Sequence, residues 1–183
     1  FTENGHCASA IVPSGASTGT HEAFELRDKE NQNYLGKSVF KAVDNIDGPI
    51  TKALKSIDIN NQKKIDKILI DLDGTEKKKK LGSNAILAVS IAACKITAIE
   101  KNISLFKYLG NSKTSQLPVP LLNIINGGVH AKNNLDIQEF MIRPDKAKSF
   151  TEAMRVSFLV IQNLKSMLDV SNVGDEGGFA PNL

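Results

Sequence analysis

The segment from Leu81 to about Lys101 is strongly apolar, and it restricts how the amino-terminal half of the chain can fold. Between Ala85 and Ala93 nearly every residue is small or aliphatic. A helix that is apolar around most of its circumference has to be covered by neighbouring elements. We therefore expect this segment to be the core helix of a first domain.

Two further helices are expected to pack around it. Residues 37–55 carry apolar side chains at spacings of three and four, which predicts an amphipathic helix, and Gly48-Pro49 predicts a kink within it. A second helix is predicted over 60–72, where Asp73-Gly74-Thr75 ends it. Residues 7–13 alternate small, polar and β-branched side chains, which predicts a strand.

The second half of the chain has a different order of elements. Residues 110–116 are polar and predict a linker. After it, the apolar run 121–125 predicts a buried strand, 136–142 a second strand and 149–168 a long amphipathic helix. Residues 172–183 are expected to form a loop.

The composition excludes several classes of protein. The net charge of +3, from 23 basic and 20 acidic side chains, is too mild and too mixed for a nucleic-acid surface, which leaves small anionic molecules as partners. Cys7 and Cys94 match no metal or disulfide spacing, which predicts reduced thiols in a cytosolic protein. No stretch approaches the roughly 18 uncharged apolar residues that span a bilayer, and no signal peptide is visible.

Four polar clusters lie where a strand ends or a loop begins, which is where functional side chains are usually displayed. The first, Ser14 to Gly19, combines glycines with hydroxyls, so it can fold over a phosphate or offer oxygen ligands to a hard cation. It lacks the lysine of a P-loop, and a mobile surface loop is the alternative. In the second, two glycines after a buried strand place His130 at the mouth of the sheet as a hydrogen-bond donor or proton carrier. A structural or simply exposed histidine is the alternative there.

The other two clusters carry carboxylates. Gln138 and Glu139 point to opposite faces of a regular strand, unless the strand ends or bulges there. A partly buried Glu139 can act as a proton donor or acceptor, and an outward-facing glutamate is the alternative. Asp175 and Glu176 stand between glycines in a close turn, which suggests a proton donor or a metal ligand, with an acidic surface turn as the alternative.

Taken together in their order, the motifs closely resemble those of the enolase family over practically the whole chain. Asn133 to Ile137 look more like bacterial than animal enolases. The motifs are Val12-Pro-Ser-Gly-Ala-Ser-Thr-Gly19, Leu72-Asp-Gly-Thr75, Leu81-Gly82 with Asn84-Ala-Ile-Leu87, Leu117-Pro-Val-Pro120, Asn126-Gly-Gly128 with His130-Ala131, Gln138-Glu-Phe-Met-Ile142 and Val173-Gly-Asp-Glu-Gly-Gly-Phe-Ala-Pro-Asn182.

This resemblance implies a fold in two parts. Residues 1–114 would form an α+β amino-terminal domain that lacks its first strand. Residues 115–183 would form the opening strand–strand–helix portion of a truncated, enolase-type (β/α)₈ TIM-like barrel. Both ends of the chain look cut, because the first residue is Phe1 rather than Met and the last residues break off inside a Gly-rich loop.

The resemblance also implies an activity, the Mg²⁺-dependent and reversible dehydration of 2-phosphoglycerate to phosphoenolpyruvate in glycolysis. Ser17 matches the loop serine that ligates the second Mg²⁺. His130, Gln138 and Glu139 match substrate-contacting positions, and Glu176 matches the proton donor that helps the 3-hydroxyl to leave as water. Glu139 close to Glu176 would suit this role, because neighbouring carboxylates favour holding a proton between them.

The sequence departs from the family pattern in several places. The three carboxylate ligands of the first Mg²⁺, the lysine base and the phosphate-binding region all lie beyond the point where this chain stops. We therefore expect the 183-residue chain to be inactive by itself. The segment before Val173 is also shorter than the family pattern leads us to expect.

The resemblance further implies a cytoplasmic homodimer, with a possible additional pool at the cell surface or in secretions. A non-catalytic, plasminogen-binding surface protein is the alternative from another functional class, although the usual C-terminal lysine is not available here. A generic phosphate-binding module built on Ser14 to Gly19 would leave the other three clusters unexplained.

Overall fold

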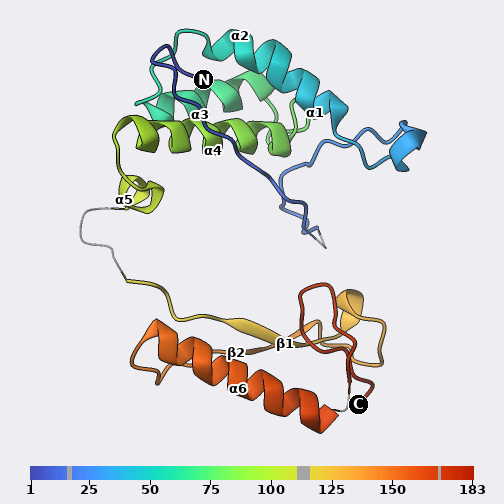
Figure 1. The fold of residues 1–183 in the computed structure, drawn as a ribbon. Coiled ribbons are helices and arrows are strands. Elements are labelled where there is room, and N and C mark those ends of the chain that lie inside the picture. Colours follow the sequence, from blue (N-terminus) through green and yellow to red (C-terminus); the bar gives the residue numbers. More distant parts are fainter. Residues whose placement is uncertain (16–17, 111–115, 169) are drawn as a thin grey trace. The chain divides into compact units, whose positions relative to one another are not determined.

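The computed structural model describes residues 1–15, 18–110, 116–168 and 170–183. The chain separates into two compact units, Phe1–Thr114 and Ser115–Leu183. Helices dominate the first unit, whereas the second combines a small sheet with one long helix (Figure 1).

Helix α4 (Ser83–Glu100) is the central element of the first unit, as its apolar sequence predicts. It contacts α3 (Gln62–Asp73), α1 (Phe40–Asn45) and the short α5 (Leu105–Leu109). Figure 1 shows α3 and α4 side by side, with α1 and α2 (Thr51–Leu54) beside them. The core of buried apolar residues comprises Ala42, Ile50, Ile65, Leu69, Leu81 and Ala85.

The predicted kink at Gly48-Pro49 is a π-helical turn, η2 (Ile46–Ile50), which joins α1 to α2. Pro49 has no N–H to donate, so an unbroken α-helical ladder is impossible at this point. The backbone N–H of Thr51 donates to the carbonyl of Ile46, and its hydroxyl donates to the same carbonyl at 2.7 Å. The turn thereby keeps the chain helical across the proline.

Both ends of α3 follow from local sequence. The Asn61 side chain accepts a hydrogen bond from the Lys64 N–H at 3.0 Å, which caps the start of the helix. Gly74 ends it in a left-handed conformation with φ of 67°, which glycine adopts without a steric penalty. The predicted range of 60–72 is therefore close to the observed one.

Asp73 stabilises the turn between α3 and α4. Its carboxylate is buried, with 2% of the residue exposed, and it accepts hydrogen bonds from the N–H groups of Leu81 at 2.7 Å and Thr75 at 3.0 Å. Replacing Asp73 by Ala should lower the free energy of unfolding by about 1–3 kcal/mol, because the buried Leu81 N–H loses its acceptor. Urea unfolding followed by circular dichroism measures this loss. The exposed neighbour Asp71 is the matched control, and Asp71→Ala should change stability by less than about 0.5 kcal/mol.

The same carboxylate predicts how this difference depends on pH. Burial raises the pKa of Asp73, but the hydrogen bonds from Leu81, Thr75 and Lys80 outweigh burial and hold the pKa below its ordinary value of 3.8. The contribution of Asp73 is therefore complete above pH 3.8 and is lost as the pH falls through the lowered pKa of the folded state. Wild type and Asp73→Ala should converge in stability in strong acid. If the difference in free energy of unfolding between the two proteins persisted in strong acid, it would contradict a stabilising role for the ionised Asp73.

Two features of the first unit differ from expectation. The strand predicted over 7–13 is wrong, because these residues form no strand and no described segment pairs with them. The five-residue helix α5 and the 3₁₀ turn η1 (Gln32–Tyr34) were not predicted, since neither is long enough to show a periodic pattern.

By length and composition, α4 is long and apolar enough to cross a membrane, and it is the one such helix in the described part of the chain. This finding differs from the expectation that no stretch approaches that length. It is weak evidence, because the core helix of a soluble protein passes the same test. Within the first unit α4 packs against α3, α1 and α5, and 33% of it is buried.

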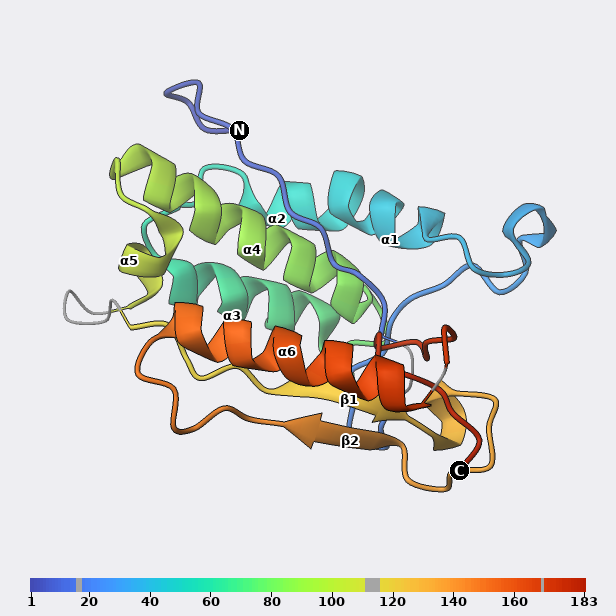
Figure 2. The ribbon, with the colours of Figure 1, turned by 60° about the horizontal axis from the view of Figure 1, so that its bottom comes forward.

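The second unit is built on two antiparallel strands, β1 (Leu122–Asn126) and β2 (Glu139–Ile142). The long helix α6 (Phe150–Leu168) runs alongside them in both views (Figures 1 and 2). The other edge of β1 meets Phe179 in a parallel bridge. The predicted order of strand, strand and helix is confirmed.

Candidate functional site

His130 is placed by a tight turn at the end of β1. The 3₁₀ turn η3 (Gly128–His130) follows directly after Gly127, and Gly128 has a φ of 54°, in the left-handed region that glycine favours. The N–H of Gly127 donates to the carbonyl of Gln138 at 3.0 Å, which ties the turn to the start of β2. The imidazole is thereby buried, with 3% of the side chain exposed.

Glu139 is the first residue of β2, and Gln138 lies just outside the strand. Because the strand begins between these two residues, the alternation of a regular strand does not force their side chains to opposite faces, and both can approach one site. The Gln138 Nε2 donates to Glu139 Oε1 at 3.4 Å. In the ladder, Glu139 stands opposite Asn126, the last residue of β1.

Glu176 is carried by a closed turn in the segment after α6. The N–H of Gly174 donates to the carbonyl of Gly178 at 2.8 Å, and the N–H of Gly177 donates to the carbonyl of Gly174 at 3.0 Å. The N–H of Asp175 donates to the carbonyl of His130 at 3.1 Å, which fastens this turn to the histidine turn. The Glu176 carboxylate thereby lies beside the His130 ring.

His130, Glu139 and Glu176 form a cluster, and their side chains come from three separate segments. The His130 Nδ1 lies 3.4 Å from Glu176 Oε2 and 4.0 Å from Glu139 Oε1. The two carboxylates are 22% and 37% exposed for Glu139 and Glu176, respectively, so the cluster opens to solvent on their side. A protonated imidazole would form ion pairs with both of them.

Neither ring nitrogen of His130 has a hydrogen-bond partner within the part of the chain that the structure describes. Nearly all buried polar atoms in native proteins are hydrogen-bonded, so two such atoms on one ring require an explanation. A bound ligand, or a proton exchanged with the adjacent carboxylates, supplies one. The cluster therefore has the chemistry of a binding or proton-transfer site.

Among the predicted site residues, the structure brings together His130, Gln138, Glu139 and Glu176. Ser17 lies outside the described residues. The hydroxyl of Ser14, the first residue of the predicted cluster Ser14 to Gly19, donates to Glu25 Oε2 at 2.8 Å.

Two asparagines near the cluster were assigned no role from the sequence. The Asn123 Nδ2 donates to Glu176 Oε2 at 3.3 Å, and Asn126 is fully buried between the segments that carry the carboxylates. The ladder is irregular between Asn123 and Ile125, so Asn123 and Asn126 stand opposite Met141 and Glu139 and share one face. For Asn123 the available signal was a polar residue inside the apolar run 121–125, and Asn126 is the first residue of the motif Asn126-Gly-Gly128.

The cluster fits acid–base chemistry better than it fits Mg²⁺. The ligand atoms of His130, Glu139 and Glu176 lie within 4.8 Å of one another, close enough to hold a metal ion. Mg²⁺ requires oxygen ligands in octahedral geometry, whereas the most buried donor here is an imidazole nitrogen. These three residues do not match a magnesium site.

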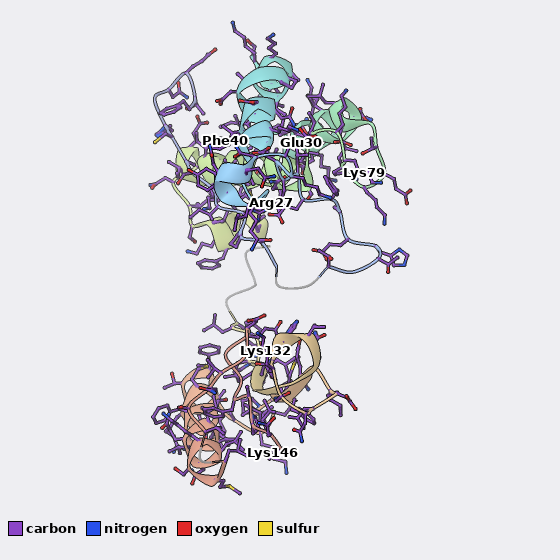
Figure 3. The ribbon with its side chains drawn as sticks, turned by 90° about the vertical axis from the view of Figure 1, so that its right-hand side faces the viewer. Arg27, Glu30, Phe40, Lys79, Lys132 and Lys146 are labelled. Atoms are coloured by element: carbon purple, nitrogen blue, oxygen red, sulfur yellow. The ribbon has the colours of Figure 1, made fainter. Side chains whose placement is uncertain are left out.

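His130 also borders a cavity of about 490 Å³. Lys132, labelled in Figure 3, lines it together with Asp175. Neither Glu139 nor Glu176 borders this cavity, so the candidate chemistry lies at the cluster and not in the cavity.

Comparison with known proteins gives matches along nearly the whole chain. A family model described as "Enolase, N-terminal domain" matches residues 1–109, and one described as "Enolase, C-terminal TIM barrel domain" matches residues 114–183. The chain is 58% identical over 178 residues to a protein named enolase from Pelagibacter ubique (strain HTCC1062). That match covers 95% of this chain and 43% of the relative, so the chain spans less than half the length of the protein it matches.

Proposed function

This chain belongs to the enolase family, with the amino-terminal domain followed by the start of the TIM barrel, and from that premise we propose that the complete protein is a glycolytic phosphopyruvate hydratase. It would convert 2-phosphoglycerate reversibly to phosphoenolpyruvate and water, as a carbon–oxygen lyase. The observation that carries the proposal is the buried imidazole of His130, whose nitrogens have no hydrogen-bond partner among the described residues and which lies 3.4 Å from the carboxylate of Glu176.

Glu176 is the proposed proton donor. Hydroxide is a poor leaving group, so the 3-hydroxyl has to gain a proton as its carbon–oxygen bond breaks. The carboxyl proton of Glu176 passes to that oxygen, which leaves as water. The electron pair left at carbon 2 by the earlier loss of its proton then forms the double bond. Asn123, which donates to Glu176 Oε2 at 3.3 Å, holds this carboxyl group in place.

His130, Gln138 and Glu139 are the proposed substrate contacts. The ring nitrogens of His130 have no hydrogen-bond partner among the described residues, so the imidazole can donate a hydrogen bond to the substrate. The side-chain amide of Gln138 donates to Glu139 Oε1 at 3.4 Å and orients that carboxylate. Glu139 also lies near the proposed proton donor, since its carboxylate and that of Glu176 both approach His130 Nδ1. The His130 side chain is 3% exposed, so its position is fixed by the surrounding turns.

The proposal includes two Mg²⁺ ions in the complete protein, which stabilise the negative charge that develops on the substrate carboxylate when bound. Ser17 is the proposed ligand of the second ion in this chain, and the remaining ligands have no counterpart in the 183 residues. A homodimer in the cytoplasm completes the proposal.

The 183-residue chain is expected to be inactive, because the family's lysine base and first magnesium site have no counterpart in it. The complete protein should turn over 2-phosphoglycerate with Mg²⁺, and the purified 183-residue chain should show no turnover above buffer. Absorbance of phosphoenolpyruvate measures both. An inactive complete protein would contradict the proposed function, and an active 183-residue chain would contradict the assignment of the missing groups.

A further inference from the structure

Asn126 is fully buried, and its polar groups are all used within the second unit. Its side-chain Oδ1 accepts from the N–H of Gly178 at 3.0 Å, and its Nδ2 donates to the carbonyl of Gln138 at 3.4 Å. Its backbone N–H donates to the carbonyl of Phe179 at 2.9 Å, and its carbonyl accepts from Asn133 Nδ2 at 2.8 Å. One carboxamide therefore joins two segments that are distant in sequence.

Each of these two segments carries one carboxylate of the cluster. Gln138 immediately precedes Glu139, and Gly178 closes the turn that holds Glu176. Asn126 also stands directly opposite Glu139 in the β ladder. The carboxamide is thus a physical link between the backbones on which the two acids are mounted.

The packing around this link is tight. A Cβ at Gly174 would lie 2.6 Å from the Asn126 Cβ, and a Cβ at Gly178 would lie 2.7 Å from its Oδ1. The backbone of residues 174–178, the turn that carries Glu176 and is called the acid turn below, therefore lies directly against the asparagine. With so little free space around it, the Asn126 side chain restricts where the backbone of the turn can lie.

We propose that Asn126 is a positioning residue, whose carboxamide sets where Glu176 and Glu139 lie around His130. The inference rests on the proposed function, because it assigns Asn126 to the geometry of that same reaction. The Asn126 side chain acts through the backbones that carry Glu139 and Glu176, and it does not touch the substrate. A displacement of about 1 Å in a reacting group can cost on the order of 100-fold in rate, so loss of this link should be visible in kcat.

Two variants of Asn126 separate the two hydrogen bonds. Asn126→Ala removes both, and its smaller side chain meets no steric obstacle. Asn126→Asp keeps an acceptor for the Gly178 N–H but, as an ionised carboxylate, has no donor for the Gln138 carbonyl. Asn133→Ala is the control, because it removes the hydrogen bond to the Asn126 carbonyl and the one that Asn133 Oδ1 accepts from the Leu135 N–H, and it leaves the Asn126 carboxamide intact.

The first measurement is hydrogen exchange of the Gly178 amide by NMR in the 183-residue chain, which is independent of activity. Its protection should fall about 10- to 100-fold in Asn126→Ala and stay close to wild type in Asn126→Asp and Asn133→Ala. Unchanged protection in Asn126→Ala would overturn the proposed anchor.

The second measurement is the kinetics of the complete protein with 2-phosphoglycerate. We expect kcat to fall about 100-fold in Asn126→Ala and about tenfold in Asn126→Asp, with KM within about threefold in both. Asn133→Ala should stay within about threefold of wild type in kcat. Wild-type kcat in Asn126→Asp would overturn the proposal, and that variant decides the matter even if Asn126→Ala does not fold.

The two measurements keep the two levels of inference apart. If the wild-type complete protein fails to turn over 2-phosphoglycerate, the proposed function is wrong, and the exchange experiment still decides whether Asn126 anchors the acid turn. If turnover is normal but kcat does not respond to the loss of the carboxamide, the function stands and the role of Asn126 is refuted.

Discussion

Replacing Glu176 by Gln in the complete protein is expected to lower kcat about 10²- to 10⁴-fold with little change in KM. Glutamine has nearly the same shape and still offers an oxygen to Asn123 Nδ2, which lies 3.3 Å from Glu176 Oε2. It has no carboxyl proton to give to the departing hydroxyl. The loss should therefore appear in the chemical step, and absorbance of phosphoenolpyruvate measures it.

The control for this variant is Asp175→Asn. Asp175 is adjacent in sequence and carries the same charge, but its side chain is not part of the cluster of His130, Glu139 and Glu176. Its removal should change kcat by less than about threefold, since only its backbone N–H holds the turn to His130. Equal losses in the two variants would indicate a general effect of negative charge and would refute the assigned role.

The Glu176→Gln variant also separates the two halves of the reaction. Loss of the proton from carbon 2 requires a base and does not involve Glu176. The variant incubated with 2-phosphoglycerate in D₂O should therefore still exchange the hydrogen at carbon 2, which NMR of the substrate detects. Loss of this exchange together with dehydration would place Glu176 in proton abstraction and contradict its role as the donor.

Replacing Gly174 by Ala is expected to damage both the stability of the second unit and the site. The added Cβ would lie 2.6 Å from the Asn126 Cβ and 2.6 Å from the His130 carbonyl oxygen, and neither atom belongs to a flexible side-chain end. Overpacking of this kind costs about 1–3 kcal/mol. Because the acid turn has to move away from His130, kcat should also fall more than about tenfold. Urea unfolding and steady-state kinetics measure the two effects.

Gly177→Ala is the informative comparison for this prediction. Gly177 has a φ of 81°, and a Cβ added there would have no atom within 4 Å, so alanine meets strain in the backbone but no steric clash. We expect a loss of stability of about 1 kcal/mol and a smaller loss of kcat than in Gly174→Ala. A larger kinetic effect at Gly177 would show that the turn's conformation, and not its contact with Asn126, controls the position of Glu176.

The helices could be predicted because their signals are local. The spacing of apolar residues, the Asn61 cap and the Gly74 ending lie within α3 or next to it, and Pro49 marks the π-helical turn. The strand predicted over 7–13 failed for the opposite reason. A strand exists only with a hydrogen-bonded partner, and an alternating pattern carries no information about whether a partner is present.

The candidate site was predictable residue by residue but not as an arrangement. The glycines around His130 and Glu176 marked turns at which side chains are displayed, which is a local property. The distance of 3.4 Å between these two residues depends on the antiparallel ladder and on the hydrogen bond from Asp175 to the His130 carbonyl. The placement of Asn123 and Asn126 on one face follows from an irregular register, which the sequence alone does not reveal.

The hydrogen bond between Asn126 and Gly178 joins residues 52 positions apart in the chain, and this separation has a consequence for folding. The β hairpin and α6 are made of contacts nearer in sequence, so they can form first, whereas closing the long loop costs more chain entropy. During synthesis the strands also leave the ribosome before the segment that carries Glu176. We therefore expect the acid turn to dock last, so that His130 and Glu139 are already in place before the proton donor arrives.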